Sequence, residues 1–435
     1  MIHTIHTLSN GLRVMLIDTA SFPTVTTLLL VGAGSRYENT QNNGIAHFLE
    51  HMFFKGSKKY PNPEIISQEI EGMGGYWNAF TSKDYTGYYI KGALSHFPKM
   101  IDIISDLLLR SLFDAHEIEK EKGVIVEEIN MYEDMPQRRI SEIFENIMFP
   151  GNPLGFDIAG TKKTVTSFER NTFVNYMQSL YQPQNAVLVV AGGLSQGQKY
   201  NSKVKRYLEI IEEKFGGWKK NHTIGFSTYI RNQTSPVVHV ARKKTEQAHF
   251  CLGFPTVTIT DKRRPILKVL ATVLGGGASS RLFQEVREKR GLCYYISTGV
   301  EQYADTGYIV TQSGVAKDPK KVKDALSATI GEHAKIAKGT INGDDIARSK
   351  EMIKGRLLLS MEDSFNVANF YGMRQLREKK TETPEELIQK IDLVTKEEII
   401  TLAQGLFSSK KLHFAIIGPF KKGEFEENAL QISGI

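Results

Sequence analysis

The five residues HFLEH, His47 to His51, place two histidines and a glutamate in an otherwise apolar segment, GIAHFLEHMFFKG. The segment has no helix breaker between Gly44 and Gly56, and its pattern predicts a helix. His47 and His51 are one helical turn apart and therefore share a face, with Glu50 beside them. Two imidazoles on one face can bind one zinc ion, and a neighbouring carboxylate can deprotonate a metal-bound water. The triple therefore predicts a hydrolytic zinc site.

The alternative interpretation is that both histidines make ordinary hydrogen bonds in a core. An internal repeat bears on this choice, because a second apolar helix, RPILKVLATVLGGG, follows an alternating strand in the same way. When the two helices are aligned on their terminal glycines, the positions of the triple are taken by Leu267, Leu270 and Ala271. Packing therefore does not require polar residues there, and the metal-ligand interpretation is favoured.

A catalytic zinc ion usually has three protein ligands and one open position, so this site needs a third ligand. The acidic segment HEIEKEKGVIVEEINMYED, residues 116–134, has a helical pattern and is the candidate donor. Glu121 and Glu128 are two helical turns apart and share a face, whereas Glu127 points about 100° away and is expected to face solvent. Taken alone, the segment is equally well explained as a solvated helix face.

The helices and strands expected around these residues occur in the same order twice along the chain, and the boundary between the two copies lies near residue 220. Each copy has an alternating strand followed by an apolar helix that ends in glycine, and each closes with a helix, a turn and an apolar strand. Residues 216–236 between them are polar and rich in Gly, Asn and Thr, as in an exposed linker. We therefore predict an α+β fold of two homologous domains, residues 1–220 and 221–435, from an internal duplication.

Composition excludes several classes of protein. The chain has 435 residues, 41% of them hydrophobic and 24% charged, as in globular proteins with more than one core. Its net charge of +7 is scattered in short runs rather than clustered with aromatic residues, which argues against nucleic-acid binding. No apolar run reaches the roughly 20 residues of a membrane span. The first residues, MIHTIHTLSNGLRV, lack a basic region followed by an apolar one, so no secretion signal is expected from them. Cys251 and Cys293 are expected to be buried thiols in a reducing, cytoplasmic environment.

The chain as a whole resembles a known family. HFLEH is the inverted zinc motif H-x-x-E-H of the inverzincins, and the later acidic segment completes a pattern similar to the family of pitrilysin, insulin-degrading enzyme and mitochondrial processing peptidase. The likeness covers nearly the whole chain and continues, in family order, through NGLRV, GGYWNAFTSKDYTGYY, VIVEEINMYED, YQPQNAVLVVAGG and SSRLFQEVREKRGLCYYIS. The length fits the short, two-domain bacterial-type branch, whose chains pair into four-domain chambers. This resemblance implies a processing-peptidase-like metallohydrolase fold, in which each domain is a mixed, mainly antiparallel sheet packed with helices.

The resemblance also implies roles in the first domain. His47, His51 and Glu128 would be the zinc ligands. Glu50 would be the general base acting on zinc-bound water, and Glu121 would support the site from behind the ligands.

Further roles implied by the resemblance concern the substrate. Asn78 and Ala79 would lie on an exposed strand edge that pairs with an extended peptide. The alternative is an ordinary sheet edge, and the aromatic residues of this stretch are equally compatible with core packing. In the second domain, which lacks the zinc motif, Arg287 and Tyr294 would hold the substrate carbonyl and stabilise the oxyanion. Tyr295 is a close rival for Tyr294, and Arg287 taken alone is one surface charge among several.

The function expected from the sequence is that of a Zn²⁺-dependent metalloendopeptidase or oligopeptidase, which hydrolyses extended or unfolded peptides in a closed chamber. The expected partners are peptides and a second chain, either identical or a paralogue, so that the active site is shared within a dimer. One alternative is a noncatalytic chamber-forming subunit of a heterodimeric processing peptidase, although such subunits have usually lost part of the metal motif. Another is a zinc hydrolase of a non-peptide substrate, against which the aromatic strand edge argues.

Overall fold

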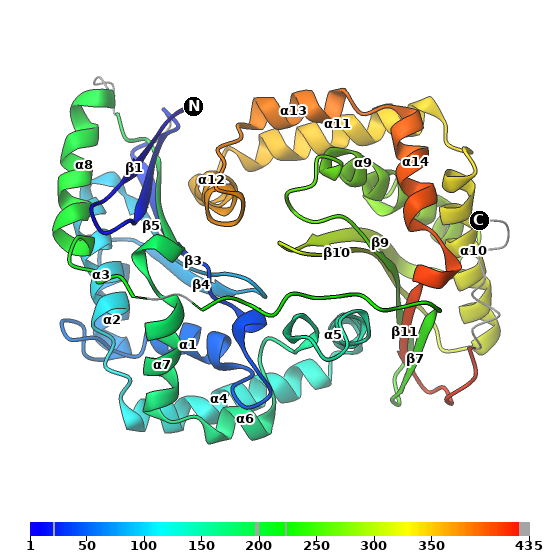
Figure 1. Ribbon diagram of the computed structural model, residues 1–435, viewed down its shortest axis with the longest axis horizontal. Coiled ribbons are helices and arrows are strands. Elements are labelled where there is room, and N and C mark those ends of the chain that lie inside the picture. Colours follow the sequence, from blue (N-terminus) through cyan, green and yellow to red (C-terminus); the bar gives the residue numbers. More distant parts are fainter. Residues whose placement is uncertain (21, 196–199, 222–223, 426–435) are drawn as a thin grey trace. The chain divides into compact units, whose positions relative to one another are not determined.

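The computed structural model describes residues 1–20, 22–195, 200–221 and 224–425. The chain forms two compact units, each built around one β-sheet (Figure 1). The first unit comprises residues 1–129, 156–227 and 359–382, and the second comprises residues 130–155, 228–358 and 383–435. The part of residues 216–236 that is described contains no helix or strand, and residues 222–223 of the expected linker lie outside the described residues.

The sheet of the first unit has six strands in the order β1-β2-β6-β3-β5-β4. All neighbouring pairs are antiparallel except β2 and β6, which run parallel. Within the described residues, strand β4 pairs only with β5 and is therefore an edge strand. The strands are β1 (Ile2–Thr7), β2 (Arg13–Asp18), β3 (Thr24–Val31), β4 (Tyr76–Thr81), β5 (Thr86–Ala93) and β6 (Ala186–Gly192).

Helices cover both faces of this sheet, as two neighbouring tyrosines of β5 illustrate. Tyr88 stacks on Phe53 of α1, with ring centroids 3.9 Å apart, whereas Tyr89 packs against Phe365 of α12 at 4.3 Å. Successive strand residues point to opposite faces, so α1 and α12 lie on opposite sides of the sheet. The helices are α1 (Ile45–Phe53), α2 (Pro63–Glu71), α3 (Phe97–Leu109), α4 (Ala115–Glu133), α6 (Lys162–Ser167), α7 (Arg170–Leu180), α8 (Tyr200–Phe215) and α12 (Ser364–Glu378).

The sheet of the second unit has five strands in the order β7-β11-β8-β10-β9, with only β7 and β11 parallel. This order repeats the pattern of the first sheet without its β1 strand, as expected of a duplicated domain. The strands are β7 (Val237–Arg242), β8 (Gln247–Pro255), β9 (Cys293–Gln302), β10 (Gly307–Ala316) and β11 (His413–Gly418). The helices are α5 (Pro136–Met148), α9 (Arg264–Gly275), α10 (Pro319–Ala337), α11 (Gly343–Ser360), α13 (Pro384–Asp392) and α14 (Lys396–Leu406), with a π-helical turn at Phe283–Glu288.

Two helices pack on the sheet of the other half of the sequence. Helix α12 follows the second sheet's helices in the chain, but Val367, Ala368 and Tyr371 pack against the first sheet. Conversely, α5 precedes the second half, but Ile140 and Phe144 pack with residues of β8, β10 and β11. The compact units are therefore discontinuous in sequence. The division into residues 1–220 and 221–435, which follows the duplication, stays a prediction.

The expected α+β class, with two mixed and mainly antiparallel sheets packed with helices, is confirmed. In the described part of the chain, none of the helices combines the length and apolar character needed to cross a bilayer. Cys251 is buried, Cys293 is half-buried, and both are free thiols.

Candidate metal centre

Helix α1 carries HFLEH, and its amphipathic sequence explains its orientation. Six of its nine residues are buried, all apolar, and they anchor the helix in the first unit: Ile45, Ala46, Phe48, Leu49, Met52 and Phe53. His47, Glu50 and His51 lie on the remaining face and are half-buried. In the second unit, the aligned residues Leu267, Leu270 and Ala271 of α9 are all buried in the apolar core, as the comparison of the two helices predicts.

The start of α1 is fixed by a carboxylate from outside the helix. Gly44 precedes the helix in a left-handed conformation (φ 98°), and a Cβ at this position would meet the carbonyl of Ala159 at 2.8 Å. The buried Glu38 carboxylate accepts hydrogen bonds from the backbone N–H groups of Gly44 and Ala46, each at 2.8 Å, and from the Asn43 side chain at 2.9 Å. Burial raises the pKa of Glu38 to about 7. Glu38 thus satisfies helix N–H groups that lack a partner within the helix.

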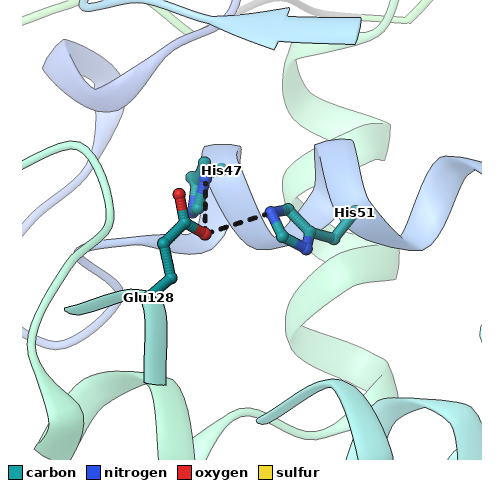
Figure 2. Close-up of side chains that lie close together, drawn as sticks. All are labelled: His47, His51 and Glu128. Carbon is teal, nitrogen blue, oxygen red and sulfur yellow. Dashed lines mark ion pairs between the residues drawn. The ribbon is translucent and has the colours of Figure 1, made fainter. Parts of the chain in front are cut away.

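The two imidazoles of α1 face a carboxylate on α4. Oε2 of Glu128 lies 3.6 Å from Nε2 of His47 and 3.5 Å from Nε2 of His51 (Figure 2). The centroids of the two imidazole rings are 4.6 Å apart, and the three candidate ligand atoms lie within 4.8 Å of one another. No other group of three or more metal-ligating side chains of this kind is found in the described part of the chain.

The donor set and spacing fit zinc. Two imidazole nitrogens and one carboxylate oxygen form a three-ligand set of the kind found in catalytic zinc sites. Ligand atoms about 2.0–2.1 Å from a tetrahedral ion are about 3.3 Å from each other, close to the Glu128–histidine separations. Burial lowers the pKa of His51, but the carboxylates of Glu121 and Glu128 raise it overall to about 9. The site therefore favours a cation.

A chain of polar contacts from Glu121 and Lys55 holds His51 on the side away from Glu128. Nδ1 of His51 lies 2.9 Å from Oε1 of the buried Glu121, and Oε2 of Glu121 lies 2.6 Å from Nζ of Lys55. Burial raises the pKa of Glu121, but the contacts with His51 and Lys55 lower it overall, so this carboxyl is charged. A charged carboxylate at Nδ1 holds the proton on that nitrogen, so Nε2, the atom that faces Glu128, is the nitrogen that would lose its proton and bind a metal ion.

Glu50 lies beside this centre and is held by a residue of β4. The hydroxyl of Thr81 donates a hydrogen bond of 2.5 Å to Oε2 of Glu50. Burial raises the pKa of Glu50, and the charge of Glu128 adds to this effect, whereas Thr81 and His51 oppose it. A carboxylate with a raised pKa beside a metal centre is suited to accept a proton.

Asn78 and Ala79 lie in the middle of the edge strand β4. The side-chain oxygen of Asn78 accepts a hydrogen bond of 2.8 Å from the N–H of Ala79. This N–H therefore points away from β5, toward the open edge of the sheet. Asn78 is exposed and Ala79 half-buried. The position of both residues on an accessible edge is what pairing with a peptide requires.

Arg287 and Tyr294 belong to the second unit, where they lie close together. The Arg287 guanidinium is 5.7 Å from the centroid of the Tyr294 ring, and Tyr294 is 72% exposed. Tyr295 differs, because its hydroxyl lies 3.1 Å from Nδ1 of His249 and accepts a hydrogen bond from Gln312. Tyr294 therefore has the accessible ring, whereas the Tyr295 hydroxyl is engaged within its own unit.

The fold and the His-His-Glu centre with an adjacent carboxylate are typical of a metallohydrolase. Residues 13–162 match the family described as Insulinase (Peptidase family M16), and residues 167–353 match the Peptidase M16 inactive domain. The chain belongs to peptidase family M16.

Relatives and solved structures agree with this assignment. The chain is 35% identical to the uncharacterized zinc protease YmxG of Bacillus subtilis over 95% of this chain and 98% of that protein. It is 33% identical to an uncharacterized zinc protease of Streptomyces coelicolor, over 95% of this chain and 89% of that protein. A crystal structure of a protease from Helicobacter pylori has the same fold, with a TM-score of 0.88 at 21% identity, covering 96% of this chain and 99% of that one.

The comparisons confirm the family expected from the sequence and support a metallopeptidase function. The expected zinc cofactor is supported by the donor set and by the names of the relatives. Sequence reasoning missed Glu38, Lys55 and Thr81. Lys55 lies four residues after His51, just beyond the end of α1, and this closeness in sequence is a signal that could have indicated it. Neither Glu38 nor Thr81 has such a signal, because each meets α1 only through the tertiary fold.

Proposed function

We propose that the protein is a zinc-dependent endopeptidase or oligopeptidase that cleaves extended peptides, with its inverted H-x-x-E-H motif in α1 as the catalytic segment. The observation that carries this proposal is the arrangement of four side chains from two helices. His47, His51 and Glu128 form a three-ligand set, and Glu50 stands beside them without being part of it.

The roles of the side chains follow from their contacts. Zinc, when bound, supplies Lewis-acid chemistry that acidifies water and polarises a carbonyl group. Glu50 accepts the proton from the attacking water and returns it to the leaving amine, a task for which its raised pKa is suited. Glu121 and Lys55 keep His51 in the tautomer that presents Nε2.

The substrate is proposed to bind as an added strand on β4. The outward N–H of Ala79 can donate to a peptide carbonyl once its hydrogen bond to the Asn78 side chain is broken. Pairing through the main chain recognises an extended shape before a sequence, which suits unfolded peptides. Arg287 and Tyr294 are proposed to stabilise the oxyanion.

One variant and a chelator test this function. The wild-type protein should cleave a quenched fluorescent peptide library, and a chelator should abolish the cleavage. Glu50→Gln should lose activity but keep about one zinc per chain, because Glu50 is a base and not a ligand. If Glu50→Gln loses the metal, Glu50 is a ligand. If the wild-type protein with bound zinc cleaves no peptide, the chain is a noncatalytic subunit or acts on another substrate. The closed chamber, the dimer and the cytoplasmic location stay predictions.

A further inference from the structure

Thr81 joins the strand proposed to bind substrate to the carboxylate proposed to act as base. It is the last residue of β4, and its Oγ1 donates a hydrogen bond of 2.5 Å to Oε2 of Glu50 on α1. No other hydrogen bond to the Glu50 carboxylate is found among the residues that the structure describes. The orientation of this carboxylate therefore depends on one hydroxyl from another element.

The geometry of this contact separates the two oxygens of Glu50. A hydroxyl that donates to a carboxylate at this distance makes a short, charge-assisted hydrogen bond. Oε2 is thereby occupied, and Oε1 is left to accept a proton from water. Glu50 is half-buried and has several rotatable bonds, so without this contact its carboxylate could adopt other rotamers.

We propose that Thr81 is a positioning residue that holds Glu50 in the orientation needed for proton transfer. The proposal rests on the proposed function, because it takes Glu50 as the general base. It assigns Thr81 an effect on turnover and none on the binding of metal.

Strand β4 contacts α1 through a second residue as well as through Thr81. Trp77, Ala79 and Thr81 alternate along β4 and point to one face. The ring centroids of Trp77 and Phe54, the C-cap residue that follows α1, are 4.4 Å apart. Strand β4 is thus fixed to α1 at two points. A peptide paired with the edge at Ala79 is therefore placed in a defined register relative to Glu50.

A set of matched variants tests the role of Thr81. Thr81→Val keeps the shape of the side chain and removes the donor, whereas Thr81→Ser keeps the donor. We expect Thr81→Val to lower kcat about tenfold or more, since small errors in the position of catalytic groups are costly, with KM and zinc content close to wild type. Thr81→Ser should restore most of kcat. If Thr81→Val does not fold, Thr81→Ala replaces it.

Thr86 provides the control on the neighbouring strand. It pairs directly with Thr81, but its hydroxyl donates to the carbonyl of Ala33 at 2.8 Å and not to Glu50. Thr86→Val should lower thermal stability without the loss of kcat seen for Thr81→Val. A kcat within about twofold of wild type in Thr81→Val would overturn the proposal. So would a parallel loss of zinc and thermal stability, which would make Thr81 a structural residue.

A crystal structure of Thr81→Val with zinc bound separates this proposal from the proposed function, because it does not depend on activity. We expect the Glu50 carboxylate to leave its wild-type rotamer or to occupy several. An unchanged, well-ordered Glu50 would contradict the positioning role even if the enzyme is active. Absence of peptidase activity in the wild-type protein would contradict the proposed function instead.

Discussion

The ammonium group of Lys55 lies 2.6 Å from Oε2 of Glu121, whose other oxygen lies 2.9 Å from Nδ1 of His51. His51 is on α1, Lys55 follows just beyond the end of this helix, and Glu121 reaches both from α4. The buried carboxylate is thus clamped between a cation and an imidazole. Lys55 thereby holds the Glu121 carboxylate that orients His51, and removal of either partner of this buried carboxylate would leave its charge less well compensated.

The first prediction concerns this chain of contacts. Lys55→Met should weaken zinc binding about 10-fold and Glu121→Gln by up to about 100-fold, the range observed for groups that orient metal ligands. Lys55→Arg keeps the charge and should stay close to wild type. Competition with a chromophoric chelator measures the affinities. Equal zinc affinity in Lys55→Met and the wild type would show that Lys55 does not act through Glu121.

The second prediction concerns the third ligand. Glu128→Gln should weaken zinc binding by more than about 100-fold, beyond the effect of outer partners, because it removes the charged oxygen that faces both histidines. Glu127→Gln is the matched control, since Glu127 is the preceding residue and is exposed. Metal analysis after dialysis compares the two variants. Similar zinc contents would mean that Glu128 is not a ligand.

Helical spacing predicted that each pair of residues shares one face of its helix, whereas the family resemblance was needed to bring the two carboxylates to the histidine pair. His47 and His51 are one turn apart on α1, and Glu121 and Glu128 are two turns apart on α4. In each pair, the number of residues between the two members is enough to place them on one face of the helix. Thr81 could not be predicted in this way. Its contact with Glu50 depends on how β4 packs against α1, which no local pattern encodes.

The sequence also did not predict that α12 packs on the first sheet and α5 on the second, for a related reason. The apolar face of α12, with Val367 and Tyr371, shows that the helix must pack on something. Hydrophobic periodicity does not identify the sheet that receives it. The same holds for α5, whose Ile140 and Phe144 pack with the second sheet although the helix precedes it in the chain.

The third prediction concerns stability against pH. His333 is 1% exposed, its Nδ1 lies 2.8 Å from the Thr329 carbonyl, and burial lowers its pKa from 6.5 to about 4. The folded state therefore holds this histidine neutral. Its contribution to stability is fully present above pH 6.5 and is lost as the pH falls from 6.5 towards 4, because the unfolded chain binds the proton first.

From pH 7 to pH 5, this one group should lower the free energy of unfolding by about 2 kcal/mol. Urea unfolding at both pH values, with a chelator present so that metal binding does not contribute, measures the change. Between pH 7 and pH 5, His333→Gln should lose less unfolding free energy than the wild type, and the difference should be about 2 kcal/mol. An identical pH dependence in the two proteins would mean that His333 is protonated in the folded state or is not the responsible group.

The last prediction concerns Arg287 and Tyr294. The family resemblance implies that these two residues act on the metal centre of a partner chain. If they do, an inactive Glu50→Gln chain and an inactive Arg287→Ala chain should complement each other when subunits exchange. In a dimer with two-fold symmetry, a mixed pair holds one site with both residues intact and one with neither. Half of the dimers are mixed after random exchange, so activity should recover toward about a quarter of wild type. Light scattering and differentially tagged chains verify that mixed dimers have formed. If verified mixed dimers stay inactive, Arg287 acts within its own chain or lies outside the site, and Tyr294, whose ring lies beside it, would be excluded from a role in trans by the same result.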